Sequence, residues 1–163
     1  GFKKGSKHYH NYFKKFYDNV FFPTLEERGI DTVIDMGDTF DSRKGIDLYS
    51  LDWSQRNYFD RLRDMGCKLT SIVGNHTAFY KNTNDLNALK ELLGHYMNEV
   101  NIIIEPTVME YDGTNIGLVP WIAQDNEEQS LNFIKNVKCD ILGGHFEISG
   151  FEMLRGIINE HPI

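Results

Sequence analysis

The chain has little of what stabilises disulfide-rich or membrane-spanning proteins. Of its 163 residues, two are cysteine and four are proline. No stretch approaches the roughly 18 to 20 consecutive apolar residues of a membrane span, and the basic residues 1–13 contain no leucine run of a signal peptide. Cys67 and Cys139 stand far apart beside strand-like segments, which favours reduced thiols in a cytoplasmic protein over a disulfide framework. A secreted mini-protein and a membrane protein are therefore excluded.

Positive charge is also scarce, because 24 acidic side chains outnumber 17 basic ones and give a net charge of −7. This balance is not the overall signature of a nucleic-acid binder. Five lysines nevertheless precede the first acidic residue, Asp18; they are Lys3, Lys4, Lys7, Lys14 and Lys15. A local basic patch and a solvated helix face are both open explanations for this cluster.

What the chain does have is the composition of one globular domain, with 40% hydrophobic and 25% charged residues. No repeat, linker or low-complexity tract divides it, so residues 1–163 are predicted to form a single domain.

Helical and strand-like patterns alternate along the chain. Apolar periodicity and glycine stops predict helices over residues 7–28 (kinked at Pro23), 47–65, 84–93 and 126–137. Buried strands are predicted over residues 30–36, 68–73, 101–105 and 139–142, and a hairpin over residues 107–121 that turns at Asp112-Gly113. Such alternation indicates an α/β domain with a largely parallel sheet and an antiparallel hairpin.

Polar residues follow three of these strands, each after a glycine. The three segments are Gly37-Asp38 with Asp41, Gly74-Asn75-His76, and Gly144-His145. Because ligands of open α/β sheets bind beyond the carboxyl ends of the strands, these loops are expected to converge on one rim of the sheet. Carboxylate, amide and imidazole ligands suit Mn²⁺, Fe²⁺ or Zn²⁺. Two such ions about 3.5 to 4 Å apart, bridged by a carboxylate such as Asp38, could activate a hydroxide toward phosphorus.

Each of these residues alone is more often a cap, a turn residue or a loop residue than a ligand. Their order, each after its own strand, favours a shared site. His8 and His10 would splay to different faces of a helix and are weaker ligand candidates. Structural roles are expected for four other residues. His95 is expected at a helix end, where it would interact with the helix dipole, His161 in a loop, and Pro120 and Trp121 in packing.

These motifs resemble those of the calcineurin-like metallophosphoesterase superfamily, whose pattern is Asp-x-His, Gly-Asp, Gly-Asn-His-Asp/Glu, His and Gly-His-x-His. More narrowly, "GDTFDSRKGI", "IVGNH", "LVPW" and "GGHFEISGFEMLRG" are similar to the phage-type nuclease subunit of the SbcCD-like DNA recombination and repair complex. The resemblance covers nearly the whole chain.

The resemblance implies a calcineurin-like sandwich of two sheets flanked by helices. It makes Asp38 the ligand that bridges two divalent ions, Mn²⁺ above Fe²⁺ or Zn²⁺, and Asn75 and His145 ligands of the second ion. It makes His76 the residue that stabilises the transition state or protonates the leaving oxygen, with Asp41 close to the metals and orienting either His76 or the substrate. The implied function is DNA phosphodiester hydrolysis, exonucleolytic or endonucleolytic, with an SMC-like ATPase subunit as partner, no membrane, and a homodimer as an open alternative. A phage-encoded protein would act in the host cytoplasm.

The sequence departs from the family pattern in three places. The Asp-x-His block and the closing Gly-His-x-His block are absent, so the domain is expected to lack an N-terminal strand and a C-terminal part, and to hold at most one ion. Thr77 stands where relatives carry Asp or Glu. We therefore expect the chain alone to be inactive or weakly active. Two alternatives stay open: a small-molecule phosphoesterase of the same superfamily, and a non-catalytic binding domain.

Overall fold

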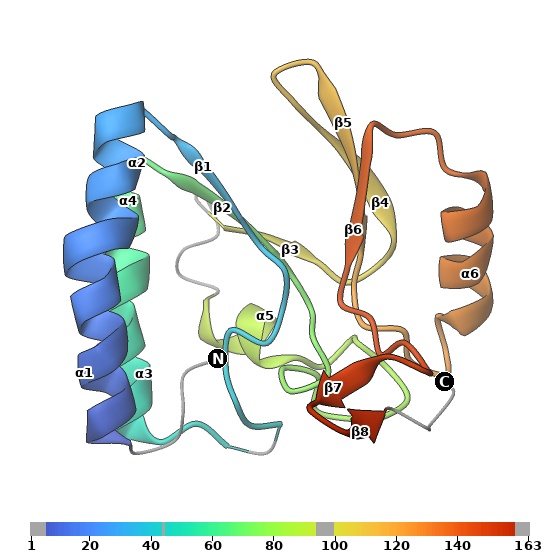
Figure 1. Cartoon of the computed structure of the whole chain (residues 1–163), viewed down its shortest axis with the longest axis horizontal. Helices are drawn as coiled ribbons and strands as arrows, with labels where there is room; N and C mark the ends of the chain where they lie inside the picture. Colours follow the sequence, from blue (N-terminus) through green and yellow to red (C-terminus); the bar gives the residue numbers. More distant parts are fainter. Residues whose placement is uncertain (1–5, 44, 94–99, 159–163) are drawn as a thin grey trace.

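The computed structural model describes residues 6–43, 45–93 and 100–158. Its layers are shown in Figure 1: a group of helices, a first sheet, a second sheet and an outer helix.

The helical layer consists of two long segments, each of which contains a π-helical turn. The first runs through α1 (Lys7–Phe16), η1 (Tyr17–Phe21) and α2 (Phe22–Arg28), and the second through α3 (Leu48–Ser54), η2 (Gln55–Phe59) and α4 (Asp60–Asp64). Gly29 ends the first segment with a φ of 62°, a conformation that glycine adopts without a steric cost. Pro23, where a kink was predicted, lies in the first turn of α2 directly after the π turn η1; proline lacks the N–H that a continuous α-helix would use there.

The strands form two three-stranded sheets and a small ribbon. In the first sheet, β1 (Thr32–Asp35), β2 (Lys68–Ile72) and β3 (Val100–Ile103) are parallel and lie in that order. In the second, β4 (Thr107–Tyr111) and β5 (Thr114–Val119) form the antiparallel hairpin, and β6 (Ile141–Gly144) pairs with β5 in parallel. The ribbon consists of β7 (Glu152–Leu154) and β8 (Ile157–Ile158).

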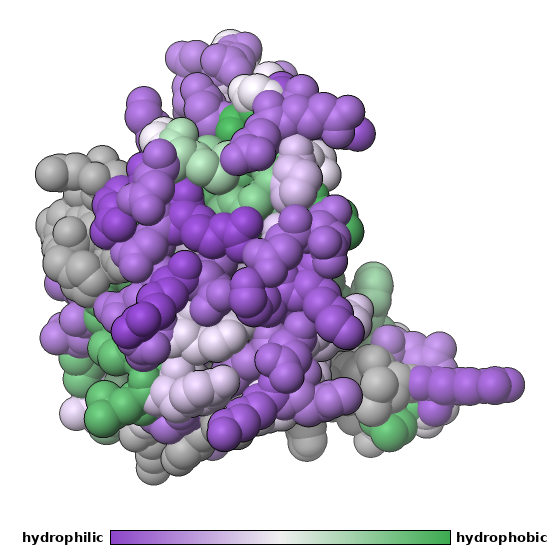
Figure 2. Space-filling view, turned by 90° about the vertical axis from the view of Figure 1, so that its left-hand side faces the viewer, coloured by the Kyte–Doolittle hydropathy of each residue, from purple (hydrophilic) through white to green (hydrophobic). Residues whose placement is uncertain are grey.

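Two apolar clusters hold these layers together. The larger one joins the helical layer to the first sheet and includes Phe59, Leu62, Leu69 and Val73. The smaller one is formed by the buried Ile72, Ile103 and Leu118, and therefore lies between the two sheets. Helix α6 (Glu127–Asn136) covers the second sheet from outside, while the outward face of the helical layer is mostly hydrophilic (Figures 1 and 2). The fold is α/β, with two sheets flanked by helices; the calcineurin-like sandwich stays a prediction.

Several predicted boundaries were wrong. The helix predicted over residues 84–93 is α5 (Ala88–Leu92), which starts later because the Asn87 side chain caps it. The strand predicted over residues 139–142 lies two residues further along, and β7 and β8 were not predicted. The strand predicted as buried over residues 30–36 is half-buried, because β1 has a strand beside it on one edge in the described part of the sheet. Leu48, placed in the apolar stripe of its helix, is 82% exposed at the first turn of α3.

Both cysteines are free thiols, as predicted. Within the described ranges, no helix is long and apolar enough to cross a bilayer.

Candidate functional site

The loop after β1 is held in a tight turn that places Asp38 at the end of the strand. Gly37 and Asp38 have φ values of 99° and 55°, in the left-handed region that few non-glycine residues adopt. The Asp35 carboxylate stabilises this turn by accepting hydrogen bonds from the Gly37 N–H at 3.0 Å and the Thr39 hydroxyl at 2.6 Å. Burial raises the pKa of the Asp35 carboxyl, and these two hydrogen bonds oppose that rise.

The loop after β2 is closed by Thr77, which follows the Gly74-Asn75-His76 segment directly. Its buried hydroxyl donates to the Gly74 carbonyl at 3.0 Å and accepts from the Gly74 N–H at 2.9 Å. Asp38 packs directly against Gly74, where a Cβ atom would overlap both the carboxylate and the backbone nitrogen of Asp38. Only glycine therefore allows the two loops to approach this closely. Thr77 supports the turn that carries Asn75 and His76, and no contact joins it to the His76 ring among the interactions of the described residues.

His145 reaches the same place from the second sheet. Its backbone N–H donates to Val119 at 3.0 Å, and the N–H of Trp121 donates to Val73 at 2.7 Å, which ties the end of β5 to the end of β2. The sequence-based expectation of one shared sheet rim was therefore wrong in its topology. The loops after β1 and β2 leave one sheet, whereas His145 follows β6 of the other.

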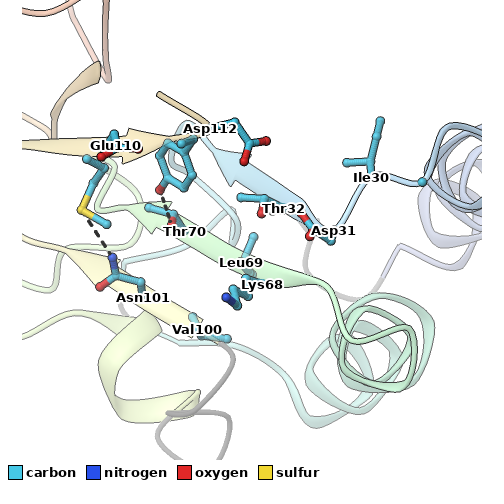
Figure 3. Close-up of a pocket in the computed structure, with 13 residues that line it drawn as sticks. Ile30, Asp31, Thr32, Lys68, Leu69, Thr70, Val100, Asn101, Glu110 and Asp112 are labelled. Carbon is cyan, nitrogen blue, oxygen red and sulfur yellow. Dashed lines mark hydrogen bonds between the residues drawn. The ribbon is translucent and has the colours of Figure 1, made fainter. Parts of the chain in front are cut away.

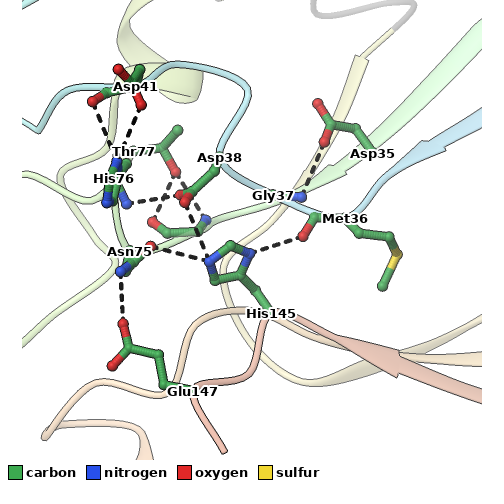
Figure 4. A network of polar contacts seen from close by, with 11 residues as sticks. Asp35, Met36, Gly37, Asp38, Asp41, Asn75, His76, Thr77, His145 and Glu147 are labelled. Carbon is green, nitrogen blue, oxygen red and sulfur yellow. Dashed lines mark hydrogen bonds and ion pairs between the residues drawn. The ribbon is translucent and has the colours of Figure 1, made fainter. Parts of the chain in front are cut away.

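Three hydrogen-bond acceptors meet at this junction (Figure 4). His145 Nε2 lies 3.1 Å from Asn75 Oδ1 and 3.5 Å from Asp38 Oδ2. The His145 Nδ1 is 3.0 Å from the Met36 carbonyl oxygen, which can only accept, so this nitrogen carries a proton. The Asn75 Nδ2 donates to Glu147 at 2.7 Å, so the amide oxygen faces inward.

This arrangement needs a cation, or a second ring proton, between the three acceptors. In the neutral ring, Nε2 offers a lone pair toward two oxygens that also offer lone pairs. A metal ion with bonds of about 2.1 Å would separate neighbouring ligand atoms by about 3.0 to 3.4 Å, close to the separations observed. The Nδ1–H bond to a carbonyl is the contact that usually orients a ligating histidine. The residues present therefore fit one divalent ion with an amide oxygen among its ligands, although no group of three His, Cys, Asp or Glu side chains in the described chain is placed to hold a metal ion.

His76 lies beside this cluster and is oriented by Asp41. Its backbone N–H donates to Asp38 Oδ1 at 2.8 Å, while its ring Nδ1 donates to the Asp41 carbonyl oxygen at 3.3 Å and lies 3.8 Å from Asp41 Oδ1. With Nδ1 engaged, Nε2 is the nitrogen available to a substrate. The side chain is 46% exposed, so a ligand can reach it.

The structure thus brings together all five residues singled out in the sequence: Asp38, Asp41, Asn75, His76 and His145. It adds Glu147, which sequence reasoning missed although it stands inside the quoted "GGHFEISGF" segment. It also adds Asp35, which accepts a hydrogen bond from the Gly37 N–H. The position of Asp35 at the end of an apolar strand did not predict this role.

The other candidates lie elsewhere. His10 is fully buried and stacks on Trp53 with ring centroids 4.7 Å apart, and neither ring nitrogen has a hydrogen-bond partner among the residues that the structure describes. Desolvation lowers the pKa of His10, as expected of an imidazole in the core. His8 is exposed, and the packing prediction for Pro120 and Trp121 is confirmed by their burial. The predictions for His95 and His161 lie outside the described residues.

A larger pocket lies at the opposite end of the first sheet. It has a volume of about 720 Å³ and is lined by residues at the start of β1 and β2 and by the hairpin (Figure 3). Its lining includes Thr32, Lys68, Asn101 and Glu110, and the Thr70 and Tyr111 hydroxyls share a hydrogen bond of 2.7 Å across it. None of the five candidate residues lines it, so the pocket and the acceptor cluster are separate features.

Comparison with known proteins shows a similarity to a phage protein. No model of a known protein family matches the chain. Exonuclease subunit 1 of Enterobacteria phage T4 is 38% identical to it over 132 residues, which make up 81% of this chain. The chain spans 38% of the length of that relative. It is therefore similar to a part of a protein named as a subunit of a nuclease.

Proposed function

We propose that the chain provides the metal-binding part of a DNA nuclease subunit that hydrolyses phosphodiester bonds. The observation that carries the proposal is the meeting of three acceptors: Asn75 Oδ1 and Asp38 Oδ2 lie 3.1 Å and 3.5 Å from His145 Nε2. The similarity to an exonuclease subunit supports nucleic acid as the substrate class, and the family resemblance supports an SMC-like ATPase as the partner.

Asp38, Asn75 and His145 would hold the divalent cation, for which Mn²⁺ is our first choice. When bound, the ion supplies Lewis-acid activation of a phosphodiester and lowers the pKa of a bound water. Met36 and Glu147 keep His145 and Asn75 turned toward the site through the bonds described above. His76, oriented by Asp41, presents Nε2 to the substrate, where a protonated ring can donate to the leaving oxygen.

Calorimetric titration with Mn²⁺ tests the metal site directly. We expect one weak binding event in the chain, and its loss in Asn75→Ala and His145→Ala. Two tight sites, or an unchanged affinity in both variants, would contradict the assignment. Ca²⁺ and Mg²⁺ titrations serve as comparisons, because neither ion favours an imidazole ligand.

Turnover tests the role of His76. The chain alone should cut DNA at a negligible rate with Mn²⁺, and a version lengthened with segments that supply Asp-x-His and Gly-His-x-His should cut it. In the lengthened version, His76→Ala should leave Mn²⁺ binding intact and lower turnover by about two to four orders of magnitude, the scale of general acid catalysis. An unchanged rate would remove His76 from the mechanism. Hydrolysis of bis(p-nitrophenyl) phosphate without DNA cleavage would instead favour the small-molecule alternative, and DNA binding without any hydrolysis the non-catalytic one.

A further inference from the structure

A pair of exposed aromatic rings follows the turn that carries Asn75 and His76. Phe79 is 41% exposed and Tyr80 is 51% exposed, and their rings contact each other edge to face with centroids 4.9 Å apart. Large aromatic side chains usually leave the surface on folding because their burial is strongly favourable. Two adjacent exposed rings beside a candidate site therefore suggest a contact surface.

The loop that displays these rings is firmly attached. The Phe79 N–H donates to Leu86 at 2.9 Å, and Ala78 and Asn87 form a β-bridge at the base of the loop. At its far side the Asn84 side chain donates to the Trp121 carbonyl at 2.8 Å. These bonds hold the loop in the conformation that exposes both rings.

Two cations lie next to the rings. The Arg43 guanidinium stacks over Trp121 at 4.7 Å from the ring centroid and donates to the Tyr80 carbonyl at 3.5 Å. Arg43 and Phe79 also border the same pocket of about 220 Å³. Lys81 follows Tyr80 directly and is exposed.

These two cations, unlike three arginines of the helical layer, have no carboxylate partner among the ion pairs of the described residues. Arg56, Arg61 and Arg63 each form an ion pair with an aspartate. In a chain with a net charge of −7, unpaired cations beside exposed aromatic rings indicate an anionic ligand with flat faces.

We propose that Arg43, Phe79, Tyr80 and Lys81, here called the aromatic-basic patch, bind an unpaired strand of nucleic acid beside the metal site. The rings stack on bases while the two cations contact phosphates. We propose an unpaired strand and not a duplex, because the base faces in a duplex are covered by the neighbouring base pairs and cannot stack on protein side chains. The inference rests on the proposed function, and it names the form of the nucleic acid that this site receives.

Fluorescence anisotropy with a fluorescein-labelled oligo(dT) of roughly 12 nucleotides, without divalent ions and at low salt, tests the patch. We expect Tyr80→Ala to weaken binding about tenfold, the scale of losing one stacked base, and Tyr80→Trp to restore it. Arg43→Ala should lower the magnitude of the slope of log affinity against log salt by about 0.7, the value for one phosphate contact of a single strand. A blunt duplex of equal length should bind more weakly than the oligo(dT).

Matched controls are Tyr12→Ala, which removes a 68% exposed aromatic ring from α1, and Arg56→Ala, which removes an exposed arginine from η2. Both should bind oligo(dT) as the parent chain does. The inference is overturned if the parent does not bind, if the duplex binds as tightly, or if patch and control variants behave alike. Calorimetry with Mn²⁺ on the parent and the patch variants separates the two proposals. Retained Mn²⁺ binding with no patch effect removes only this inference. Failure of the parent to bind Mn²⁺ while the patch effect is retained removes the metal site and leaves strand binding by the patch.

Discussion

The two ends of the β1–β2–β3 sheet carry similar residue types but place them differently. At the amino end, Lys68, Asn101 and Glu110 are spread around an open pocket of about 720 Å³. At the carboxyl end, oxygens of Asp38 and Asn75 lie within 3.5 Å of the His145 Nε2. The comparison teaches that similar polar residue types can line a wide pocket at one end of a sheet and converge on a single point at the other, and that our proposal rests on this convergence and not on pocket volume.

Removal of one carboxylate at each end should give the largest contrast. Asp38→Ala should weaken Mn²⁺ binding at least about a hundredfold, the upper end of the range for residues that only support a ligand, because a ligand and its negative charge are both lost. Asp31→Ala, at the start of β1, should leave the affinity unchanged. Calorimetry on both variants measures this contrast. An equal loss in the two would place the ion away from the acceptor cluster.

A methyl group at Gly74 should disrupt the carboxyl end through packing alone. Gly74→Ala forces a Cβ atom into Asp38, and we expect it to lower the free energy of unfolding by about 1 to 3 kcal/mol, the usual scale for overpacking, and to weaken Mn²⁺ binding. Gly45→Ala is the control, since that site has no atom within 4 Å of the added carbon. Urea unfolding of both variants checks the difference, which should vanish if the loops do not pack as described.

Loss of an outer contact should have a smaller effect on the ion. Glu147→Ala frees the Asn75 amide to rotate, and Mn²⁺ affinity should fall about tenfold, the lower end of the range for such supporting residues. Glu110→Ala, which removes a carboxylate from the amino-end pocket, should have no effect on the ion. If Glu147→Ala binds Mn²⁺ as the parent does, the orientation of Asn75 does not depend on this bond.

The hydrogen bond across the amino-end pocket should affect stability only. Tyr111→Phe removes the 2.7 Å bond to Thr70 and should cost about 0.5 to 1.5 kcal/mol of unfolding free energy. Mn²⁺ affinity should stay within experimental error, because this bond lies at the opposite end of the strands. A change in metal affinity would show that the two ends are coupled.

Much of this arrangement was predictable from local patterns. The Asp112-Gly113 turn, the glycine stop at Gly29 and the three glycine-led polar segments follow from conformational preferences that act over a few residues. The start of α5 was missed because Asn87 was placed inside a helix rather than at its cap, and Leu48 was misassigned because an apolar residue in a first helical turn can face solvent. The role of Glu147 depends on a contact with Asn75, 72 residues away in sequence, and local patterns carry no information about such pairs.

The sequence by itself determined the α/β class and the chemistry of the candidate ligands, because hydrophobic periodicity and side-chain type are local properties. Only the tertiary structure decided that His145 comes from a second sheet and faces Asp38 and Asn75. The backbone bond from Trp121 to Val73 and the cluster of Ile72, Ile103 and Leu118 join the two sheets. The relative placement of sheets is set by the packing of their apolar faces, which involves residues distant in sequence and is not encoded in any single segment.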